Sequence, residues 1–267
     1  MDARWSLKGK TALVTGGTRG IGKAIAEELA LLGTSVYVCA RCESRLKQRM
    51  QEWKNAGLPI SGCICDVSSF LACEQLMAEV SNKFQGKLHI LVLNAAILGV
   101  NLGPILEVPL EEILSTVRTN LEANIHLSRL AHPLLKASRE GSIVLISSIA
   151  GSQAIAPAVG TYHCTKGALN QLAKNLALEW AKDGIRVNSV APGFTDTDMA
   201  NSLGKEMLDG ARMRIPMRRL AEPHEIAAAV AFLCMPCSLY TTGSLMTIDG
   251  GLSCHNSITS CSNIEME

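Results

Sequence analysis

Short apolar runs alternate with amphipathic stretches along almost the whole chain. Residues 88–93 (LHILVL) are almost continuously apolar, which is typical of a strand that is covered on both faces. Other stretches repeat apolar residues at helical spacing, as Ile21, Ile25 and Leu29 do ahead of Gly33, which ends that helix. Strands are predicted over 10–15, 35–40, 60–65, 88–93, 142–146, 186–191 and 245–248.

Amphipathic helices are predicted between these strands. A helical region covers about 110–138, and apolar stripes mark three further helices: Leu46, Met50 and Trp53; Leu76, Val80 and Phe84; and Leu169, Leu172, Leu176 and Trp180. Strand–helix alternation without a linker or an internal repeat predicts βαβ units in one open sheet. We therefore expect an α/β fold: a single-domain, Rossmann-type, doubly wound sheet of about seven parallel strands over residues 1–267, with a flexible polar tail at 253–267.

Composition narrows the class of protein. Hydrophobic residues make up 48% of the chain and charged residues 18%, which is enough apolar material for a large core. The 25 basic and 24 acidic residues leave a net charge of +1, which argues against nucleic acid or an anionic membrane as a partner. Residues 1–10 lack the apolar region of a secretory signal, and the longest apolar stretch, 226–235, is too short to cross a membrane. We expect a cytoplasmic protein.

The cysteines and histidines form no metal-binding pattern. The chain has ten cysteines, including the CxxC pairs Cys39/Cys42 and Cys234/Cys237. Neither pair has further ligands at the spacing of a zinc finger, and the six histidines form no HExxH motif. Free thiols in a reducing compartment and no metal are therefore expected.

A glycine-rich loop follows the first predicted strand and opens the first helix. Gly16, Gly20 and Gly22 lack a Cβ, so the chain can turn tightly and a pyrophosphate can approach its backbone. The free N–H groups and the positive dipole end of the helix suit the same anion. This context predicts dinucleotide binding.

Tyr162 and Lys166 lie four residues apart and so share one face of a predicted helix. An ammonium beside a phenol favours the phenolate, so we expect the pKa of Tyr162 to lie below its ordinary value of about 10. A phenol whose pKa is nearer the working pH is the better general acid.

The chain resembles the short-chain dehydrogenase/reductase superfamily. The resemblance rests on TGxxxGxG at 15–22, on Asp66 and Asn94, and on Tyr162-x-x-x-Lys166, and it extends from residue 7 to residue 252. Long runs also look like the plant tropinone-reductase-like branch, at 5–22, 126–138, 165–193 and 232–236. Further matches to the superfamily are Asn120, Ser147-Ser148, Pro192-Gly193 and Asp249-Gly250-Gly251.

The resemblance implies a role for each matching residue. Tyr162 would protonate the substrate carbonyl, Lys166 would hold the nicotinamide ribose, Ser148 would donate to the substrate oxygen, and Asn120 would hold a water in the proton relay. A serine is suited to its role because a developing alkoxide needs a preorganised donor. The implied cofactor-binding residues are Gly16, Thr18, Arg19, Gly20, Ile21, Gly22, Arg41, Asp66, Val67, Asn94, Tyr162, Lys166, Pro192, Gly193, Thr195 and Thr197.

The chain departs from the family pattern at two places. Ser148 lies 14 residues before Tyr162, one more than is usual in this branch, and we choose it over Ser147 by its place in the sequence SSIAG. Leu93 and Ala96 stand where the family usually has Asn and Gly. We expect Leu93 to lack the polar contacts of an asparagine and Ala96 to crowd the backbone near the cofactor.

The end of the second predicted strand indicates the choice of cofactor. An NAD-dependent enzyme places an aspartate there, on the ribose hydroxyls, whereas this chain has Arg41, with Arg19 in the glycine loop. Two guanidinium groups suit a 2′-phosphate, so NADP(H) is expected. Glu43 is explained by the first turn of the following helix, where an acidic residue favours the helix dipole.

The expected function is NADPH-dependent reduction of a small hydrophobic ketone to a secondary alcohol by a homodimer or homotetramer. The resemblance points to a cyclic ketone of plant alkaloid or terpenoid metabolism. Alternatives are an NAD-dependent secondary alcohol dehydrogenase, a 3-ketoacyl thioester reductase, a dehydratase, and a dinucleotide-sensing protein without catalysis. The expected substrate pocket is mostly aliphatic, formed by Ile97, Leu98, Gln153, Ile155, Met199, Leu203 and Met207.

Overall fold

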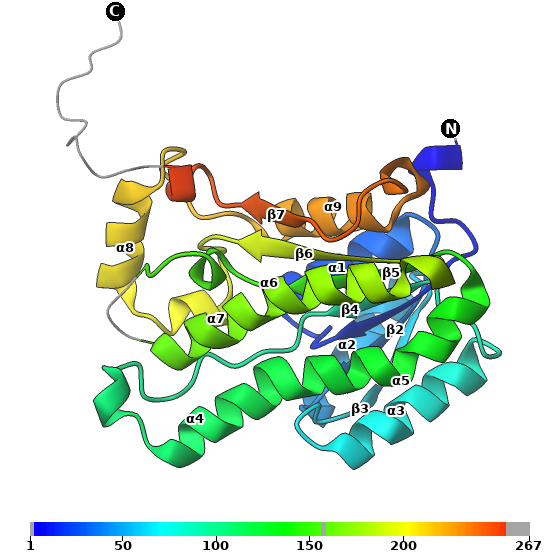
Figure 1. Cartoon of the computed structure of the whole chain (residues 1–267), viewed down its shortest axis with the longest axis horizontal. Helices are drawn as coiled ribbons and strands as arrows, with labels where there is room; N and C mark the ends of the chain where they lie inside the picture. Colours follow the sequence, from blue (N-terminus) through cyan, green and yellow to red (C-terminus); the bar gives the residue numbers. More distant parts are fainter. Residues whose placement is uncertain (1–2, 156–158, 255–267) are drawn as a thin grey trace, which may run out of the picture.

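The computed structural model describes residues 3–155 and 159–254, and it contains one parallel sheet of seven strands, in the order β3-β2-β1-β4-β5-β6-β7 (Figure 1). The predicted fold class is therefore confirmed. The predicted strand ends agree with the structure to within two residues. The strands are β1 (Thr11–Thr15), β2 (Ser35–Ala40), β3 (Ile60–Ile64), β4 (Ile90–Leu93), β5 (Gly141–Ile146), β6 (Ile185–Pro192) and β7 (Leu245–Ile248).

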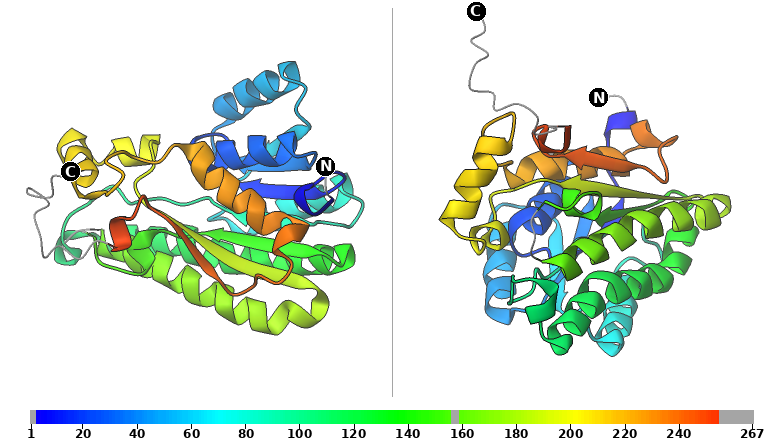
Figure 2. Two further views of the ribbon diagram at one scale, coloured as in Figure 1. Left: turned by 90° about the horizontal axis from the view of Figure 1, so that it is seen from above. Right: turned by 60° about the vertical axis from the view of Figure 1, so that its left-hand side comes forward.

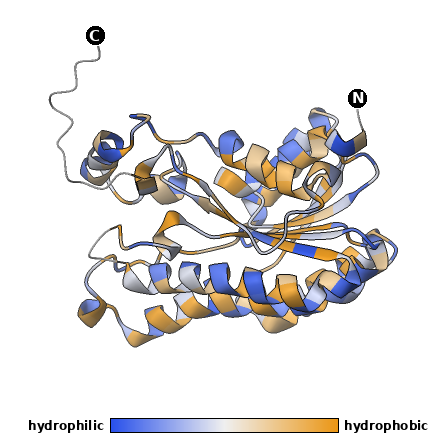
Figure 3. Ribbon diagram, turned by 45° about the horizontal axis from the view of Figure 1, so that its top comes forward, coloured by the Kyte–Doolittle hydropathy of each residue, from blue (hydrophilic) through white to orange (hydrophobic). Residues whose placement is uncertain are grey.

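Helices cover both faces of the sheet (Figure 2). One layer comprises α1 (Gly20–Leu31), α2 (Glu43–Asn55) and α9 (Pro223–Cys234). The other comprises α3 (Phe70–Lys83), α4 (Leu110–Val117), α5 (Ala123–Ser138) and α6 (Gly160–Trp180). These helices carry both hydrophilic and hydrophobic residues, as amphipathic covers of a sheet do (Figure 3).

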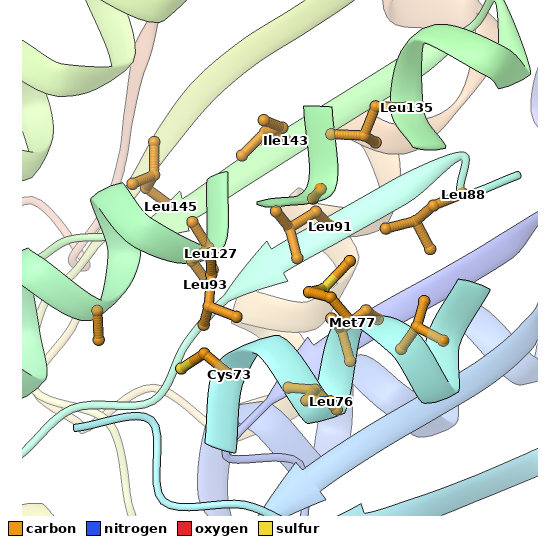
Figure 4. Packing of buried hydrophobic residues seen from close by; sticks show 14 of the residues in the cluster. Cys73, Leu76, Met77, Leu88, Leu91, Leu93, Leu127, Leu135, Ile143 and Leu145 are labelled. Carbon is orange, nitrogen blue, oxygen red and sulfur yellow. The ribbon is translucent and has the colours of Figure 1, made fainter. Parts of the chain in front are cut away.

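Alternate residues of the central strands supply the two cores. On β4, Leu91 and Leu93 join the cluster under α3 and α5, whereas Ile90 and Val92 join the cluster under α1 and α9. Figure 4 shows Leu91 and Leu93 among leucines of α5 and residues of α3. All four side chains are almost fully buried, and each such burial contributes about 1.5–3 kcal/mol. A strand buried on both faces explains the apolar run in the sequence.

The predicted helical region over 110–138 is helical throughout, but it is not a single α-helix. Between α4 and α5 lies a turn of π-helix, Arg118–Glu122, in which the backbone hydrogen bonds are one residue longer than in an α-helix. Asn120 lies in the middle of this turn.

The carboxyl ends of the strands lie at one edge of the sheet, and the strand order reverses between β1 and β4, where α/β proteins bind their ligands. After β6, the helices α7 (Asp198–Asn201) and α8 (Lys205–Arg214) lie at this same end (Figure 1).

Two further features concern the ends of the chain and the membrane. Of the predicted tail at 253–267, Ser253 and Cys254 belong to a 3₁₀ turn, Leu252–Cys254, and the N–H of Ser253 donates to Asp249. The rest of the tail, 255–267, lies outside the described residues. None of the helices described is long and apolar enough to cross a membrane.

Candidate active site

The glycine loop between β1 and α1 forms a close-fitting cradle. Gly16 and Gly20 adopt positive φ angles of 67° and 51°, a region that glycine occupies without strain. A Cβ on Gly22 would lie 2.3 Å from Nδ2 of Asn94 and 2.4 Å from the main-chain oxygen of Gly16, so only glycine fits there. Arg19 precedes α1 without a side-chain cap, and the first turn holds no acidic residue, so the N-terminus suits an anion.

Asn94 and Thr15 join the ends of the two central strands. Nδ2 of Asn94 donates to the main-chain oxygen of Thr15 at 2.9 Å, and Oγ1 of Thr15 accepts from the N–H groups of Asn94 and Ala95, each at 3.0 Å. Thr15 is the first residue of the TGxxxGxG motif, and its role at the site was not predicted from the sequence. Leu93 turns into the apolar core and makes no polar contact at the site, as expected, while Ala96 lines the cleft.

A cleft of about 590 Å³ brings the expected residues together at the carboxyl edge of the sheet. It is lined by all sixteen of the implied cofactor-binding residues and by Ser148. Of the expected substrate residues, it is also lined by Ile97, Leu98, Ile155, Met199, Leu203 and Met207.

Gln153 is not among the lining residues, contrary to expectation. Ser148 caps a 3₁₀ turn, Ile149–Gly151, and the N–H groups of Ser152 and Gln153 both close this turn by donating to Ile149. The turn therefore carries the chain past the cleft before Ile155 returns to it.

Ser148 and Ser147 have different surroundings. The Ser148 hydroxyl lies in the cleft, hydrogen-bonded to the phenol of Tyr162, and also accepts from the N–H of Ala150. Oγ of Ser147 instead donates to the main-chain oxygen of Lys166 at 3.0 Å, so that hydroxyl is engaged in holding α6 against β5. The geometry favours Ser148 for contact with a substrate.

Lys166 is held beside Tyr162 by the end of β5. Its side chain is only 3% exposed, its Nζ donates to the main-chain oxygen of Ile146 at 2.7 Å, and it lies 5.4 Å from the centre of the Tyr162 ring. Burial lowers the pKa of Lys166 to about 7, because an ammonium loses its hydration in this position.

The expected lowering of the Tyr162 pKa is wrong for this structure. Burial raises the pKa of Tyr162 to about 12, and the hydrogen bond from Ser148 offsets only part of that rise. The expectation rested on the charge of Lys166, which favours the phenolate. The loss of hydration on burial disfavours the phenolate more strongly here.

Asn120 is fully buried behind the cleft and fixes its floor. Its amide accepts from the N–H of Ile97 at 2.9 Å and donates to the carbonyl of Ile97 at 2.8 Å. The same Nδ2 lies 3.3 Å from Oγ1 of Thr165, a residue whose place at the site was not predicted from the sequence. The role of Asn120 in holding a water remains a prediction.

Basic residues gather where the cleft passes β2. Arg41 is exposed there, and Arg19 lies 3.3 Å from Asp198 in an exposed ion pair. Arg45, four residues after Arg41, also lines the cleft and was missed, although its spacing on α2 was a readable signal. Glu43 opens α2 as expected and pairs with Lys47 at 2.6 Å.

The other end of the cleft is mainly apolar. Besides the expected aliphatic residues it includes Leu102, Val159 and Phe194, and it includes His163, which the histidine pattern did not single out. Burial lowers the pKa of His163, so its imidazole is neutral at pH 7. Among the described residues, no cluster of three or more His, Cys, Asp or Glu is arranged to hold a metal ion.

Known proteins resemble this chain over almost its whole length. A family model described as enoyl-(acyl carrier protein) reductase matches residues 16–253. A tropinone reductase homolog of Arabidopsis thaliana is 51% identical over 256 residues, covering 95% of this chain and 96% of that relative.

Two solved structures that resemble this chain contain a nicotinamide cofactor, NADP in one and NADH in the other. A gluconate 5-dehydrogenase from Burkholderia cenocepacia, in complex with NADP and tartrate, has a TM-score of 0.89 and 27% identity, over 95% of this chain and 99% of that chain. A 7α-hydroxysteroid dehydrogenase complexed with NADH and 7-oxo glycochenodeoxycholic acid has a TM-score of 0.88 and 30% identity, over 94% and 97%.

Proposed function

Because this chain belongs to the short-chain dehydrogenase/reductase family, in its plant tropinone-reductase-like branch, we propose that it uses NADPH to reduce a small hydrophobic cyclic ketone to a secondary alcohol. The chain is an oxidoreductase that acts on CH–OH/ketone groups with a nicotinamide cofactor. One observation carries the finer proposal: Tyr162, hydrogen-bonded to Ser148, faces an apolar cleft that continues into the glycine cradle.

The residues at the glycine loop fit a dinucleotide. A Cβ at Gly22 would fill the space below Asn94, and the uncapped start of α1 offers N–H groups to a pyrophosphate. When bound there, the nicotinamide would supply the hydride for the reduction. Asp66 is held in place by hydrogen bonds from the N–H and the hydroxyl of Ser68, which positions its carboxylate beside the cleft.

The preference for NADPH is supported by charge. Arg41 and Arg45 line the cleft beside Arg19, and guanidinium groups form charge-assisted hydrogen bonds with phosphate. Glu43, the acidic residue next to this group, is engaged with Lys47. A 2′-phosphate would thus meet three cationic side chains at this end of the cleft.

The proton chemistry follows from the phenol. A pKa of about 12 keeps Tyr162 protonated at neutral pH, and a general acid for ketone reduction must carry that proton. Tyr162 would give its proton to the carbonyl oxygen as negative charge develops there, and the Ser148 hydroxyl would donate a hydrogen bond to the same oxygen. The Lys166 ammonium would stabilise the negative charge of the phenolate that results.

The apolar lining supports the substrate class. Ile97, Ile155 and Met199 come from three separate segments that line the cleft, and thioethers adapt to more than one ligand shape. Asp198, the carboxylate in this region, is paired with Arg19, so it is a poor partner for a cationic substrate. Uncharged cyclic ketones, such as intermediates with alkaloid or terpenoid skeletons, are therefore proposed ahead of keto acids.

A panel of matched ketones, each assayed with NADPH and with NADH at fixed concentration, tests the proposal. We expect turnover of uncharged monocyclic and bicyclic ketones with NADPH, and little turnover of β-keto acids. Because the matching family model is described as an acyl-carrier-protein reductase, the panel includes acetoacetyl thioesters. Activity confined to those thioesters would replace the cyclic-ketone proposal with a thioester reductase, and activity confined to NADH would overturn the cofactor assignment.

A further inference from the structure

Three residues near the start of α6 point one face of the helix into the cleft. Tyr162, His163 and Lys166 line it, at intervals of one and three residues that place them on one side of the helix. Val159, the residue before the helix, also lines the cleft. Cys164, the residue that follows His163, is exposed and does not line the cleft. The helix therefore presents His163 to the same space as the proposed acid.

His163 lies close to Tyr162 in the cleft. The two ring centres are 6.4 Å apart and the rings meet edge to face at 65°. The side chain of His163 is half-buried, and within the described part of the chain neither of its ring nitrogens has a hydrogen-bond partner. A hydrogen bond from its main-chain N–H to Val159 holds the residue at the start of the helix.

The imidazole of His163 is suited to a neutral partner. Burial alone accounts for its lowered pKa, and no neighbouring charge contributes. In its neutral form the ring has one N–H donor and one acceptor nitrogen. A neutral ring supplies no opposite charge to offset the lost hydration of a substrate carboxylate or ammonium in a mainly apolar cleft, whereas a hydroxyl, ether or second carbonyl would complete a hydrogen bond with it.

Much of the cleft that His163 lines is apolar. Its apolar lining residues include Leu98, Leu102, Ile155, Val159, Leu203 and Met207. A purely hydrocarbon ketone would remove water from the imidazole and leave it unpaired, which costs binding free energy. A ketone with a second polar group would avoid this loss.

We propose that His163 is a specificity-determining residue that selects ketones carrying a second, uncharged hydrogen-bonding group on their hydrophobic body. This inference rests on the proposed ketone reduction and adds to it a second point of recognition. Tyr162 and Ser148 bind the reacting oxygen, and His163 binds the other polar group. Two fixed points orient the ring of a cyclic substrate, so His163 also determines which face of the carbonyl is reduced.

The test compares 4-hydroxycyclohexanone with 4-methylcyclohexanone, which match in size and differ in the polar group. We expect wild-type kcat/KM to favour the hydroxyketone by about tenfold, the discrimination given by one good hydrogen bond. In His163→Leu this ratio falls to about one, because the hydroxyketone is turned over more slowly while the methylketone is not. His163→Asn, whose amide keeps a donor and an acceptor, recovers part of the ratio.

Cys164→Ala is the matched control, since it changes the adjacent residue outside the cleft and should leave the ratio unchanged. Equal wild-type kcat/KM for the two ketones would overturn this inference and leave the proposed function standing. So would an equal loss on both ketones in His163→Leu, which indicates a packing role. Absence of turnover with every ketone would instead overturn the proposed function itself.

Discussion

Nζ of Lys166 donates a 2.7 Å hydrogen bond to the main-chain oxygen of Ile146, the last residue of β5. This bond connects the Lys166 side chain on α6 to the carboxyl edge of the sheet, and it holds the ammonium over the ring of Tyr162. The fold thus places a cationic group in a position where burial opposes its charge. A measurable dependence of stability on pH follows.

The first prediction concerns the stability contribution of Lys166. Its pKa is about 7 in the folded protein and 10.5 in the unfolded chain, so between these values the unfolded state binds more protons and stability rises with pH. The cost of burying the charge is thus nearly complete at pH 7 and below, and it disappears only above about pH 10.5. Lys166→Met removes this contribution, so the wild type should gain stability relative to the variant by about 3 kcal/mol between pH 6 and pH 9.

Urea unfolding of both proteins at several pH values, without cofactor, measures this difference. The unpaired Ile146 carbonyl in the variant lowers its stability equally at every pH, so it does not affect the slope. A difference between the two proteins that stays constant with pH would show that Lys166 remains charged in the folded protein.

The second prediction concerns Tyr162 as the general acid. Tyr162→Phe keeps the ring packing and removes the proton, so we expect NADPH binding to be retained and kcat to fall by about 10²- to 10⁴-fold. Lys166→Ala should reduce both cofactor affinity and kcat. Fluorescence titration with NADPH and steady-state kinetics separate the two effects. A Tyr162→Phe protein that keeps more than a few per cent of wild-type kcat would disprove the assignment.

The third prediction concerns the 2′-phosphate. Arg41→Asp replaces a cation with an anion and supplies an acceptor for the ribose hydroxyls, so the preference should change from NADPH to NADH. The loss of charge-assisted bonds should cost roughly 1.5–3 kcal/mol, or about 10- to 100-fold in NADPH affinity. Lys54→Ala is the control, because it removes an exposed cation from α2 outside the cleft. Equal KM for both cofactors in the wild type would contradict the prediction.

The fourth prediction concerns the glycine cradle. Gly22→Ala must displace the Asn94 amide or the Gly16 carbonyl, so we expect weaker NADPH binding and a lower melting temperature. Gly210→Ala is the matched control in α8, where a Cβ meets no atom within 4 Å and the backbone is helical. That substitution should raise stability by about 0.5–1 kcal/mol. Thermal melts with and without NADPH measure both, and identical cofactor affinity in the two variants would disprove the cradle.

The parallel sheet was predictable because its strands are buried on both faces and read as apolar runs, as in β4. The π-helical turn at 118–122 was not, since five residues at helical spacing look the same whether the hydrogen bonds are α or π. Family motifs gave the positions of Ser148 and Tyr162. The direction of the Tyr162 pKa shift depends on desolvation by residues distant in the sequence, so no local motif contains it.

The sequence also did not predict several contacts that single side chains make at the site. Thr15 accepts from two main-chain N–H groups that directly follow the neighbouring strand β4, which becomes apparent only from the register of β1 and β4. His163 belongs to the cleft because of its angle on α6, whereas the sequence offered no separate histidine motif. Gln153 shows the reverse case, in which a local turn removes an expected residue from the site.

The fifth prediction concerns Thr165, which connects Asn120 to Tyr162. Its Oγ1 lies 3.3 Å from Nδ2 of Asn120 and donates to the main-chain oxygen of Tyr162 at 2.8 Å. Thr165→Val keeps the shape and removes both hydrogen bonds, so kcat should fall by about 3- to 10-fold with little change in the KM for NADPH. Thr165→Ser keeps the hydroxyl and should retain most of the activity although it leaves a small cavity. A packing role predicts the opposite order, with valine tolerated better than serine, so steady-state kinetics on the two variants distinguish positioning from packing.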